Sequence, residues 1–148
     1  MEEQEHRLVV CSSFEELRRV DSWAEMLGQK FGLSETSLYG VRLCLAEAVT
    51  NIISYAYGPT GQDSEEEVRR QHHKILITCM PAEESLVISV EDDGVAFDPL
   101  QKPPPVLGES LEGVAVGGHG INLIRIFTNA VAYVRQDDRN RLTMVLTR

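Results

Sequence analysis

An apolar stripe along residues 38–52 constrains the fold of this chain more than any other feature. Leu38, Val41, Leu45, Ala48 and Ile52 follow one another at alternating spacings of three and four residues. Side chains at these spacings lie on one face of an α-helix. The stripe therefore predicts a helix, capped by Ser34 and ending near Tyr57, that packs one face against the rest of the protein.

Two polar residues border this stripe. Glu47 and Asn51 are four residues apart, so their side chains project from the same helix face, and the small residues Gly40, Cys44 and Ala48 surround them. A carboxylate and a carboxamide at the margin of a buried face cost free energy unless they have partners. The partner is either a bound ligand or solvent, and this stretch alone leaves both interpretations open.

The first part of the chain predicts one strand and one further helix. The strand covers His6–Cys11. The helix begins at Ser13, where Glu16 three residues later predicts a capping box, and it ends at Gly32. Residues 61–73 are polar and rich in charge, which predicts a surface connection.

From Lys74 onward most of the chain has the apolar alternation of strands. The expected elements are a hairpin of Lys74–Met80 and Ser85–Glu91, a helix over Ile121–Thr128, and strands Ala130–Gln136 and Arg141–Thr147 around a turn at residues 137–140. This order predicts an α+β fold, a two-layer sandwich with helices on one face of a mixed, mostly antiparallel sheet. A length of 148 residues is typical of one domain, here residues 1–148.

Composition excludes several classes of protein. A net charge of −9 argues against nucleic-acid binding, which requires a basic face. No run of eighteen apolar residues occurs, and the acidic N-terminus lacks the features of a secretory signal, so we expect no membrane association. The cysteines are widely spaced, and Cys44 and Cys79 fall within apolar patterns. Buried free thiols in a cytoplasmic protein fit this usage.

Two further motifs could bind a ligand. Asp92 ends an expected strand two residues before Gly94, where a carboxylate can accept a hydrogen bond from a ligand amine. Gly118, His119 and Gly120 precede a helix and offer backbone N–H groups to an anion. Each motif alone is equally compatible with an ordinary turn, and no P-loop motif is present. Between them, residues 95–117 contain three consecutive prolines and no periodicity, which indicates a functional loop or lid.

The order of these motifs resembles the ATP-binding superfamily of gyrase, the ninety-kilodalton heat-shock chaperone, mismatch-repair ATPases and histidine kinases. The matching segments are EAVTN (residues 47–51), DDG (92–94) and GGHGINLI (117–124). Within this superfamily of histidine-kinase-like (Bergerat-type) ATPases, the chain looks most like the small stand-alone anti-sigma-factor serine/threonine kinases. Its compact length and the forms of the two motif-bearing helices carry this resemblance.

The resemblance implies a role for each matching residue. Asn51 would coordinate Mg²⁺, Asp92 would bind the adenine amine of ATP, and Gly94 would keep the base pocket open. Gly118, His119 and Gly120 would hold the phosphates, and residues 95–117 would form a lid that is mobile without nucleotide. Glu47 would act as the general base. The implied partners are an anti-sigma antagonist that carries the acceptor serine, a sigma factor as a second binding partner, and a second copy of the chain in a homodimer.

Two departures from the family pattern leave alternatives open. Ala96 stands where a second glycine is frequent, and the lid has no arginine or lysine between Lys102 and Arg125. His119 is the only candidate cation there, and histidine is mostly neutral at pH 7. One alternative is therefore a nucleotide-dependent module that sequesters a partner without phosphorylating it. The other is a detached histidine-kinase catalytic domain.

Overall fold

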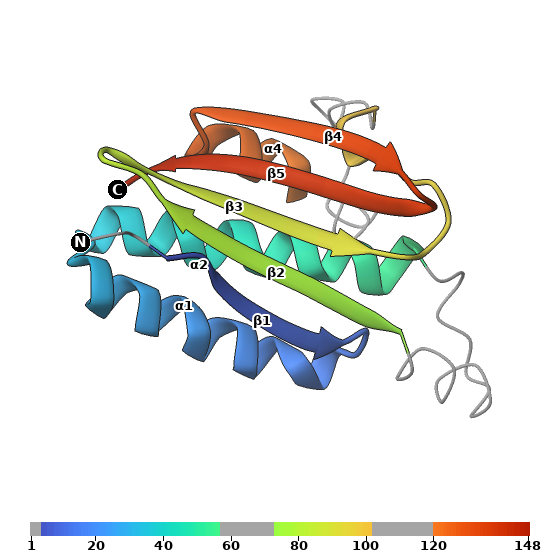
Figure 1. Cartoon of the computed structure of the whole chain (residues 1–148), viewed down its shortest axis with the longest axis horizontal. Coiled ribbons are helices and arrows are strands. Elements are labelled where there is room, and N and C mark those ends of the chain that lie inside the picture. The colour runs from blue at the N-terminus through green and yellow to red at the C-terminus, as the bar shows by residue number, and fades with distance from the viewer. Residues whose placement is uncertain (1–3, 57–72, 102–119) are drawn as a thin grey trace, which may run out of the picture.

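The computed structural model describes residues 4–56, 73–101 and 120–148, which form a sheet with helices on one face (Figure 1). The strands are β1 (His6–Cys11), β2 (Lys74–Pro81), β3 (Ser85–Asp92), β4 (Ala130–Gln136) and β5 (Arg139–Thr147), in the order β1-β2-β3-β5-β4. Every strand pairing in this sheet is antiparallel. The α+β fold class is confirmed. The sheet was expected to be mixed and mostly antiparallel, and it contains no parallel pair among the described strands.

In the part of the chain that the structure describes, three α-helices form the second layer: α1 (Leu17–Phe31), α2 (Glu35–Asn51) and α4 (Gly120–Phe127). Two 3₁₀ turns, η1 (Phe14–Glu16) and η3 (Pro99–Gln101), and a π-helical turn, η2 (Ile52–Ala56), complete the described elements. Figure 1 shows α2 lying along the sheet between α1 and α4. The helix that carries Glu47 and Asn51 is thus the centre of its layer.

The core lies between the helices and the inward face of the sheet. Strands β2 and β3 alternate strictly between buried and less buried residues, as the sequence predicted. The stripe on α2 is also confirmed, because Val41, Leu45, Ala48 and Ile52 are all buried. The inward side chains of the three central strands are Ile75, Ile77, Cys79, Leu86, Ile88, Val90, Leu142, Met144 and Leu146.

Small residues allow α2 to approach both neighbouring helices. A methyl group added at Gly40 would lie 3.2 Å from the ring of Phe127 in α4. A methyl group added at Gly28 in α1 would lie 2.8 Å from the side chain of Leu38. These close contacts fix the position of α2, and therefore of its polar residues, relative to the sheet.

The helix ends follow the sequence signals with one exception. Ser34 caps α2 by accepting a hydrogen bond from the N–H of Ser37 at 3.1 Å, and Gly32 ends α1 in the left-handed conformation at φ 61°. At the start of η1, Ser13 accepts from the N–H of Glu15. The carboxylate of Glu16, however, accepts from the N–H of Cys11 at 3.4 Å, so the expected capping box does not form.

Two predicted boundaries change. The turn expected over residues 137–140 contains only Asp137 and Asp138, both with positive φ, and β5 begins at Arg139. The helix that begins at Glu35 changes to π-helical geometry after Asn51. The predicted surface connection and most of the predicted lid lie outside the described residues. None of the helices in the described ranges is long and apolar enough to cross a membrane.

Candidate functional site

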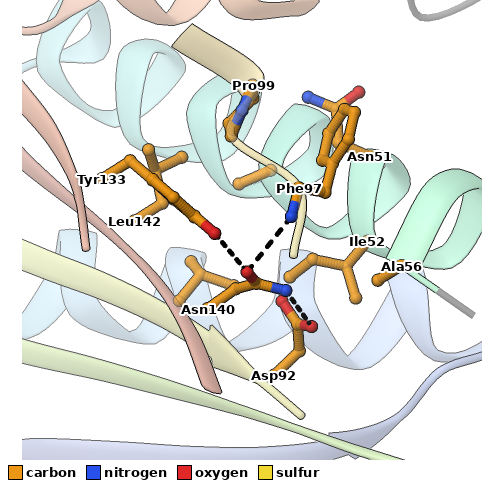
Figure 2. Close-up of a pocket in the computed structure, with 11 residues that line it drawn as sticks. Asn51, Ile52, Ala56, Asp92, Phe97, Pro99, Tyr133, Asn140 and Leu142 are labelled. Carbon is orange, nitrogen blue, oxygen red and sulfur yellow. Dashed lines mark hydrogen bonds between the residues drawn. The ribbon is translucent and has the colours of Figure 1, made fainter. Parts of the chain in front are cut away.

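A pocket opens between α2, the C-terminal end of β3, the N-terminal end of β5, strand β4 and the segment that follows β3 (Figure 2). Most of the lining is apolar or aromatic, and three polar side chains enter it from separate elements. The apolar and aromatic lining residues are Ala48, Ile52, Ala56, Val90, Phe97, Pro99, Tyr133 and Leu142; the polar residues are Asn51, Asp92 and Asn140.

Asp92 is the only acidic residue among the described residues that line this pocket. The last position of β3 places it there, and its side chain is 2% exposed. Its Oδ1 accepts hydrogen bonds from the N–H of Gly94 at 2.8 Å and from Nδ2 of Asn140 at 2.9 Å. Within the described residues no hydrogen bond to Oδ2 occurs. The carboxylate therefore offers one oxygen to a ligand that enters the pocket.

Burial raises the pKa of Asp92 above its ordinary value. The neighbouring carboxylate of Asp93 raises this pKa further, while the hydrogen bonds from Asn140 and Gly94 and the charge of Arg135 lower it. A buried carboxylate without an opposite charge in direct contact is costly in its ionised form. A ligand that donates a hydrogen bond to Oδ2 would reduce this cost.

Gly94 lies directly against the end of the α2–η2 segment. The carbonyl of Ala56 accepts a hydrogen bond from the N–H of Val95 at 2.9 Å. A methyl group added at Gly94 would lie 2.4 Å from that carbonyl oxygen, which is less than any real contact of this type. Position 94 therefore requires glycine because the backbone after β3 lies directly against the backbone at Ala56. The resemblance implied a different reason, namely that Gly94 keeps the base pocket open.

Asn51 lines the pocket from the last turn of α2 and is 6% exposed. Within the described residues its carboxamide has no hydrogen-bonding partner. Among the described residues the only fully buried side-chain N or O atom without a partner is Oγ of Ser12, so the carboxamide of Asn51 is open to the pocket and accessible to a ligand or ion that enters it. The amide oxygen of Asn51 is a suitable ligand for a hard cation such as Mg²⁺ that a bound molecule would bring into the pocket.

Glu47 lies one helical turn before Asn51 and is half-buried. It does not line the pocket wall around Asp92. Among the described residues no hydrogen bond or ion pair holds its carboxylate, which lies close enough to Cys44 to help burial raise the pKa of that thiol to about 12. The structure thus places Glu47 and Asn51 on one face, as the spacing predicted, with Glu47 further from Asp92 along the helix.

The remaining predicted residues are only partly described. Gly120 begins α4, as expected for a glycine motif that opens a helix. Gly118 and His119 lie outside the described residues, as do positions 102–117 of the predicted lid. Arg125, the first basic residue after the lid, donates a hydrogen bond to the carbonyl of Leu100 at 2.8 Å, so its guanidinium holds η3. Within the described ranges no group of three metal-ligating side chains occurs.

Sequence analysis missed three residues of this site: Phe97, Tyr133 and Asn140. The ring of Phe97 stacks on that of Tyr55 at a centroid distance of 5.2 Å. Tyr133 reaches the pocket from β4 and donates its hydroxyl to Oδ1 of Asn140 (Figure 2). Asn140 lies directly opposite Asp92 in the β3–β5 ladder. The alternation of Leu142, Met144 and Leu146, extended backward by two residues, would have placed Asn140 on the buried face.

Comparison with known proteins agrees with the fold and the motifs. The family model described as the histidine kinase-like ATPase domain matches residues 11–146. A serine/threonine-protein kinase, BtrW, of Bordetella bronchiseptica is 32% identical over 122 residues, which cover 82% of this chain and 79% of that protein. An anti-sigma F factor of Oceanobacillus iheyensis is 23% identical over 99 residues, which cover 67% of this chain and 61% of that protein.

Solved structures show the same fold at low sequence identity. The structure of the RsbU and RsbW domains of Rv1364c from Mycobacterium tuberculosis matches 98% of this chain with a TM-score of 0.63 and 11% identity, over 33% of its own length. The histidine kinase domain of the blue-light activated kinase EL346 from Erythrobacter litoralis matches 89% of the chain with a TM-score of 0.50 and 14% identity, over 59% of its own length. The family match and the 32% identical serine/threonine-protein kinase identify the chain as a member of the histidine kinase-like ATPase family, and the similarity to an anti-sigma F factor fits the anti-sigma-factor kinases within it.

Proposed function

We propose that this protein binds ATP in the Asp92 pocket and acts as an anti-sigma regulatory serine/threonine kinase. The observation that carries the proposal is the carboxylate of Asp92, which is buried in a largely apolar pocket and has one oxygen left for a ligand. An adenine ring matches both properties, because it is flat and apolar on its faces and carries an exocyclic amine that donates hydrogen bonds.

The phosphates would extend from the base toward Asn51 and the N-terminus of α4. Gly118, His119 and Gly120 would bind them through backbone N–H groups, aided by the helix dipole. The carboxamide of Asn51, which has no hydrogen-bonding partner among the described residues, would contribute one oxygen ligand to Mg²⁺, and phosphate oxygens and waters would complete its coordination. When bound, the ion would neutralise negative charge on the phosphates.

Glu47 is the proposed general base. Its carboxylate would accept the proton of a serine hydroxyl on a protein substrate while that oxygen forms a bond to the γ-phosphorus of ATP. The bond from the γ-phosphorus to the bridging oxygen breaks, and ADP leaves. Glu47 suits this role because no hydrogen bond or ion pair from the described residues occupies its carboxylate, and because it lies one turn from the proposed Mg²⁺ ligand.

The proposed substrate is an anti-sigma antagonist, and a sigma factor is a second proposed partner. The relatives support this choice, because one is named a serine/threonine-protein kinase and another an anti-sigma F factor. We propose a cytoplasmic homodimer, in line with the family resemblance. No nucleic acid is proposed as a partner, given the net charge of −9.

One observation favours a second function. Residues 103–124 contain no lysine or arginine, and Arg125 is already bound to Leu100. A lid without a cation would stabilise the transferring phosphoryl group less well. The second proposal is therefore a nucleotide-dependent module that binds and sequesters its partner without phosphorylating it.

A single experiment separates these functions. The purified chain is mixed with candidate antagonist proteins encoded near its gene, and ATP labelled at the γ-phosphate is added with Mg²⁺. Acid-stable label on one antagonist supports the kinase. Formation of a complex that depends on ATP, without any label, supports the sequestering module. Failure of the chain to bind ATP would contradict both.

A further inference from the structure

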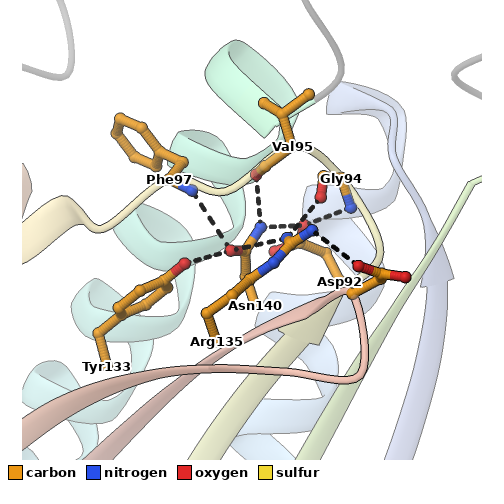
Figure 3. Close-up of polar contacts among 8 residues, drawn as sticks. Asp92, Gly94, Val95, Phe97, Tyr133, Arg135 and Asn140 are labelled. Carbon is orange, nitrogen blue, oxygen red and sulfur yellow. Dashed lines mark hydrogen bonds and ion pairs between the residues drawn. The ribbon is translucent and has the colours of Figure 1, made fainter.

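Asn140 makes an unusual number of hydrogen bonds for one side chain (Figure 3). It is 4% exposed. Its Nδ2 donates to Oδ1 of Asp92 at 2.9 Å and to the carbonyl of Val95 at 2.8 Å. Its Oδ1 accepts from the hydroxyl of Tyr133, from the N–H of Phe97 at 3.3 Å and from Nη1 of Arg135 at 3.2 Å. Because donors surround the oxygen and acceptors the nitrogen, the amide can adopt only one orientation.

This orientation determines how Asp92 faces the pocket. Oδ1 already accepts from Asn140 and from the N–H of Gly94, so its hydrogen-bonding capacity is used within the protein. Oδ2 then remains as the acceptor for a ligand. Without the donor at position 140, the carboxylate could rotate and exchange its two oxygens. The direction of the hydrogen bond offered to a ligand would then be less well defined.

The same amide also fixes the wall of the pocket. It bonds to the backbone of Val95 and of Phe97, two residues apart, and so holds the segment that follows Gly94. Arg135 strengthens this arrangement by donating to the carbonyl of Gly94 at 2.7 Å. The ring of Phe97, which lines the pocket, is thereby kept at a fixed distance from Asp92.

We propose that Asn140 is a positioning residue that sets the base specificity of this pocket. By occupying Oδ1 of Asp92 and holding the backbone at Val95 and Phe97, it presents Oδ2 as a lone acceptor to the edge of a purine. The pocket then selects a 6-amino purine over a 6-keto purine, because a keto oxygen would face Oδ2 without a hydrogen bond between them. This proposal rests on the proposed binding of ATP.

The test compares the affinities of the full chain for ATP and for inosine triphosphate, which differ at position 6 of the base. Asn140→Asp keeps the size of the side chain but removes both N–H donors and places a second carboxyl group beside Asp92. The preference for ATP over inosine triphosphate should fall by about tenfold or more, the factor that corresponds to one charge-assisted hydrogen bond. A purely structural defect would weaken both nucleotides equally and leave the ratio unchanged.

The pH dependence gives a second readout. Two adjacent carboxyl groups share a proton more readily than they both ionise. Asp93 adds to the repulsion and Arg135 opposes it, while Tyr133 supplies a hydroxyl donor. In the Asn140→Asp variant the affinity for ATP should therefore depend more strongly on pH than in the native protein.

Two further variants keep the test decisive. Arg139→Gln alters the neighbouring residue, whose Nε pairs with Glu91 at 2.9 Å on the outward face, and should leave the ratio unchanged. Tyr133→Phe removes only the hydroxyl that orients Asn140; it should reduce the ratio by about threefold and replaces Asn140→Asp if that variant does not fold. An unchanged ratio in the folded Asn140→Asp variant, or in Tyr133→Phe if the first variant does not fold, would overturn the role of Asn140 alone. If the native protein binds neither nucleotide, the proposed function and this inference both fail.

Discussion

The carbonyl oxygen of Ala56 lies so close to Gly94 that a methyl group there would be only 2.4 Å away. Ala56 ends the π-helical turn that follows Asn51, and Gly94 follows the strand that carries Asp92. The contact therefore joins the helix of the proposed Mg²⁺ ligand to the strand of the proposed base-binding residue. Any side chain at position 94 would have to move one of these two segments.

Gly94→Ala should reduce both stability and ATP affinity. We expect a loss of about 1–3 kcal/mol in the free energy of unfolding, as for other overpacked sites, and weaker binding measured by calorimetry. Gly32→Ala is the matched control, because Gly32 has φ 61° and no neighbour within 4 Å of an added methyl group. That control should cost about 1–2 kcal/mol through backbone strain alone and leave ATP affinity unchanged. Equal affinities for the native protein and Gly94→Ala would contradict the importance of this contact.

The sequence predicted most of the fold because periodicity marks each element. The stripe on α2 and the alternation in β2 and β3 reflect burial on one face, and both are confirmed. Asn140 was missed for a physical reason: Asp, Arg and Asn over residues 137–140 suit a four-residue turn. The actual turn uses positive φ at Asp137 and Asp138, which shortens it and turns Asn140 inward.

The contacts that complete the site come from elements that are distant in the sequence. Tyr133 reaches Asn140 from β4, and Phe97 meets Tyr55 across the end of the α2–η2 segment. No local pattern predicts such encounters, because they depend on how the strands are ordered and on where the segment after β3 turns. Asp92 and Asn51 could be proposed only because they sit in a recognisable motif order.

Asp92→Asn should separate stability from binding. The substitution removes the charge-assisted acceptor and places an amide nitrogen or a neutral oxygen in the pocket, so ATP should bind about 1.5–3 kcal/mol more weakly. The nucleotide-free variant should nevertheless melt at a higher temperature, since burial raises the pKa of this carboxyl and makes its ionised form costly. Calorimetric binding and thermal unfolding without nucleotide measure the two effects. A lower melting temperature would show that the ionised carboxylate is stabilising.

The sign of the pH effect follows from the raised pKa of Asp92. Between the unfolded pKa, near 3.8, and the higher folded pKa, the folded protein holds more protons than the unfolded chain. The contribution of this group to stability therefore falls as pH rises through that window, and the cost is complete above it. The melting temperatures of Asp92→Asn and the native protein should converge below the unfolded pKa and differ most above the folded pKa.

Asn51→Ala tests the proposed Mg²⁺ ligand. The carboxamide has no hydrogen-bonding partner among the described residues, so its removal should leave the fold intact. Affinity for Mg-ATP should fall below detection in calorimetry, while weak binding of ATP in the presence of EDTA should persist through the base pocket. Unchanged affinity for Mg-ATP in a folded Asn51→Ala protein would remove Asn51 from the site.

The three cysteines should differ in reactivity. Burial raises the pKa of Cys79 to about 12, as burial together with Glu47 does for Cys44. Cys11 is only half-buried, and its Sγ accepts a hydrogen bond from Lys74 at 3.2 Å. At pH 8 a thiol reagent should therefore modify only Cys11 rapidly in the native protein and all three residues in denaturant. Rapid modification of Cys44 in the native protein would mean that α2 moves away from the core often enough to expose this thiol to solvent.

Glu47→Gln distinguishes an enzyme from a binding module. The amide keeps the shape of the side chain but cannot accept the serine proton, so phosphate transfer to the antagonist should slow by at least about 10²-fold. Binding of ATP should stay within about twofold of the native value, because Glu47 does not line the base pocket. The matched control is Asp21→Asn, which breaks the surface ion pair of Asp21 with Arg42 at 2.7 Å and should leave transfer unaffected. If Glu47→Gln transfers phosphate as fast as the native protein, Glu47 is not the base; if neither protein transfers phosphate but both bind the antagonist with ATP, the chain acts by sequestration.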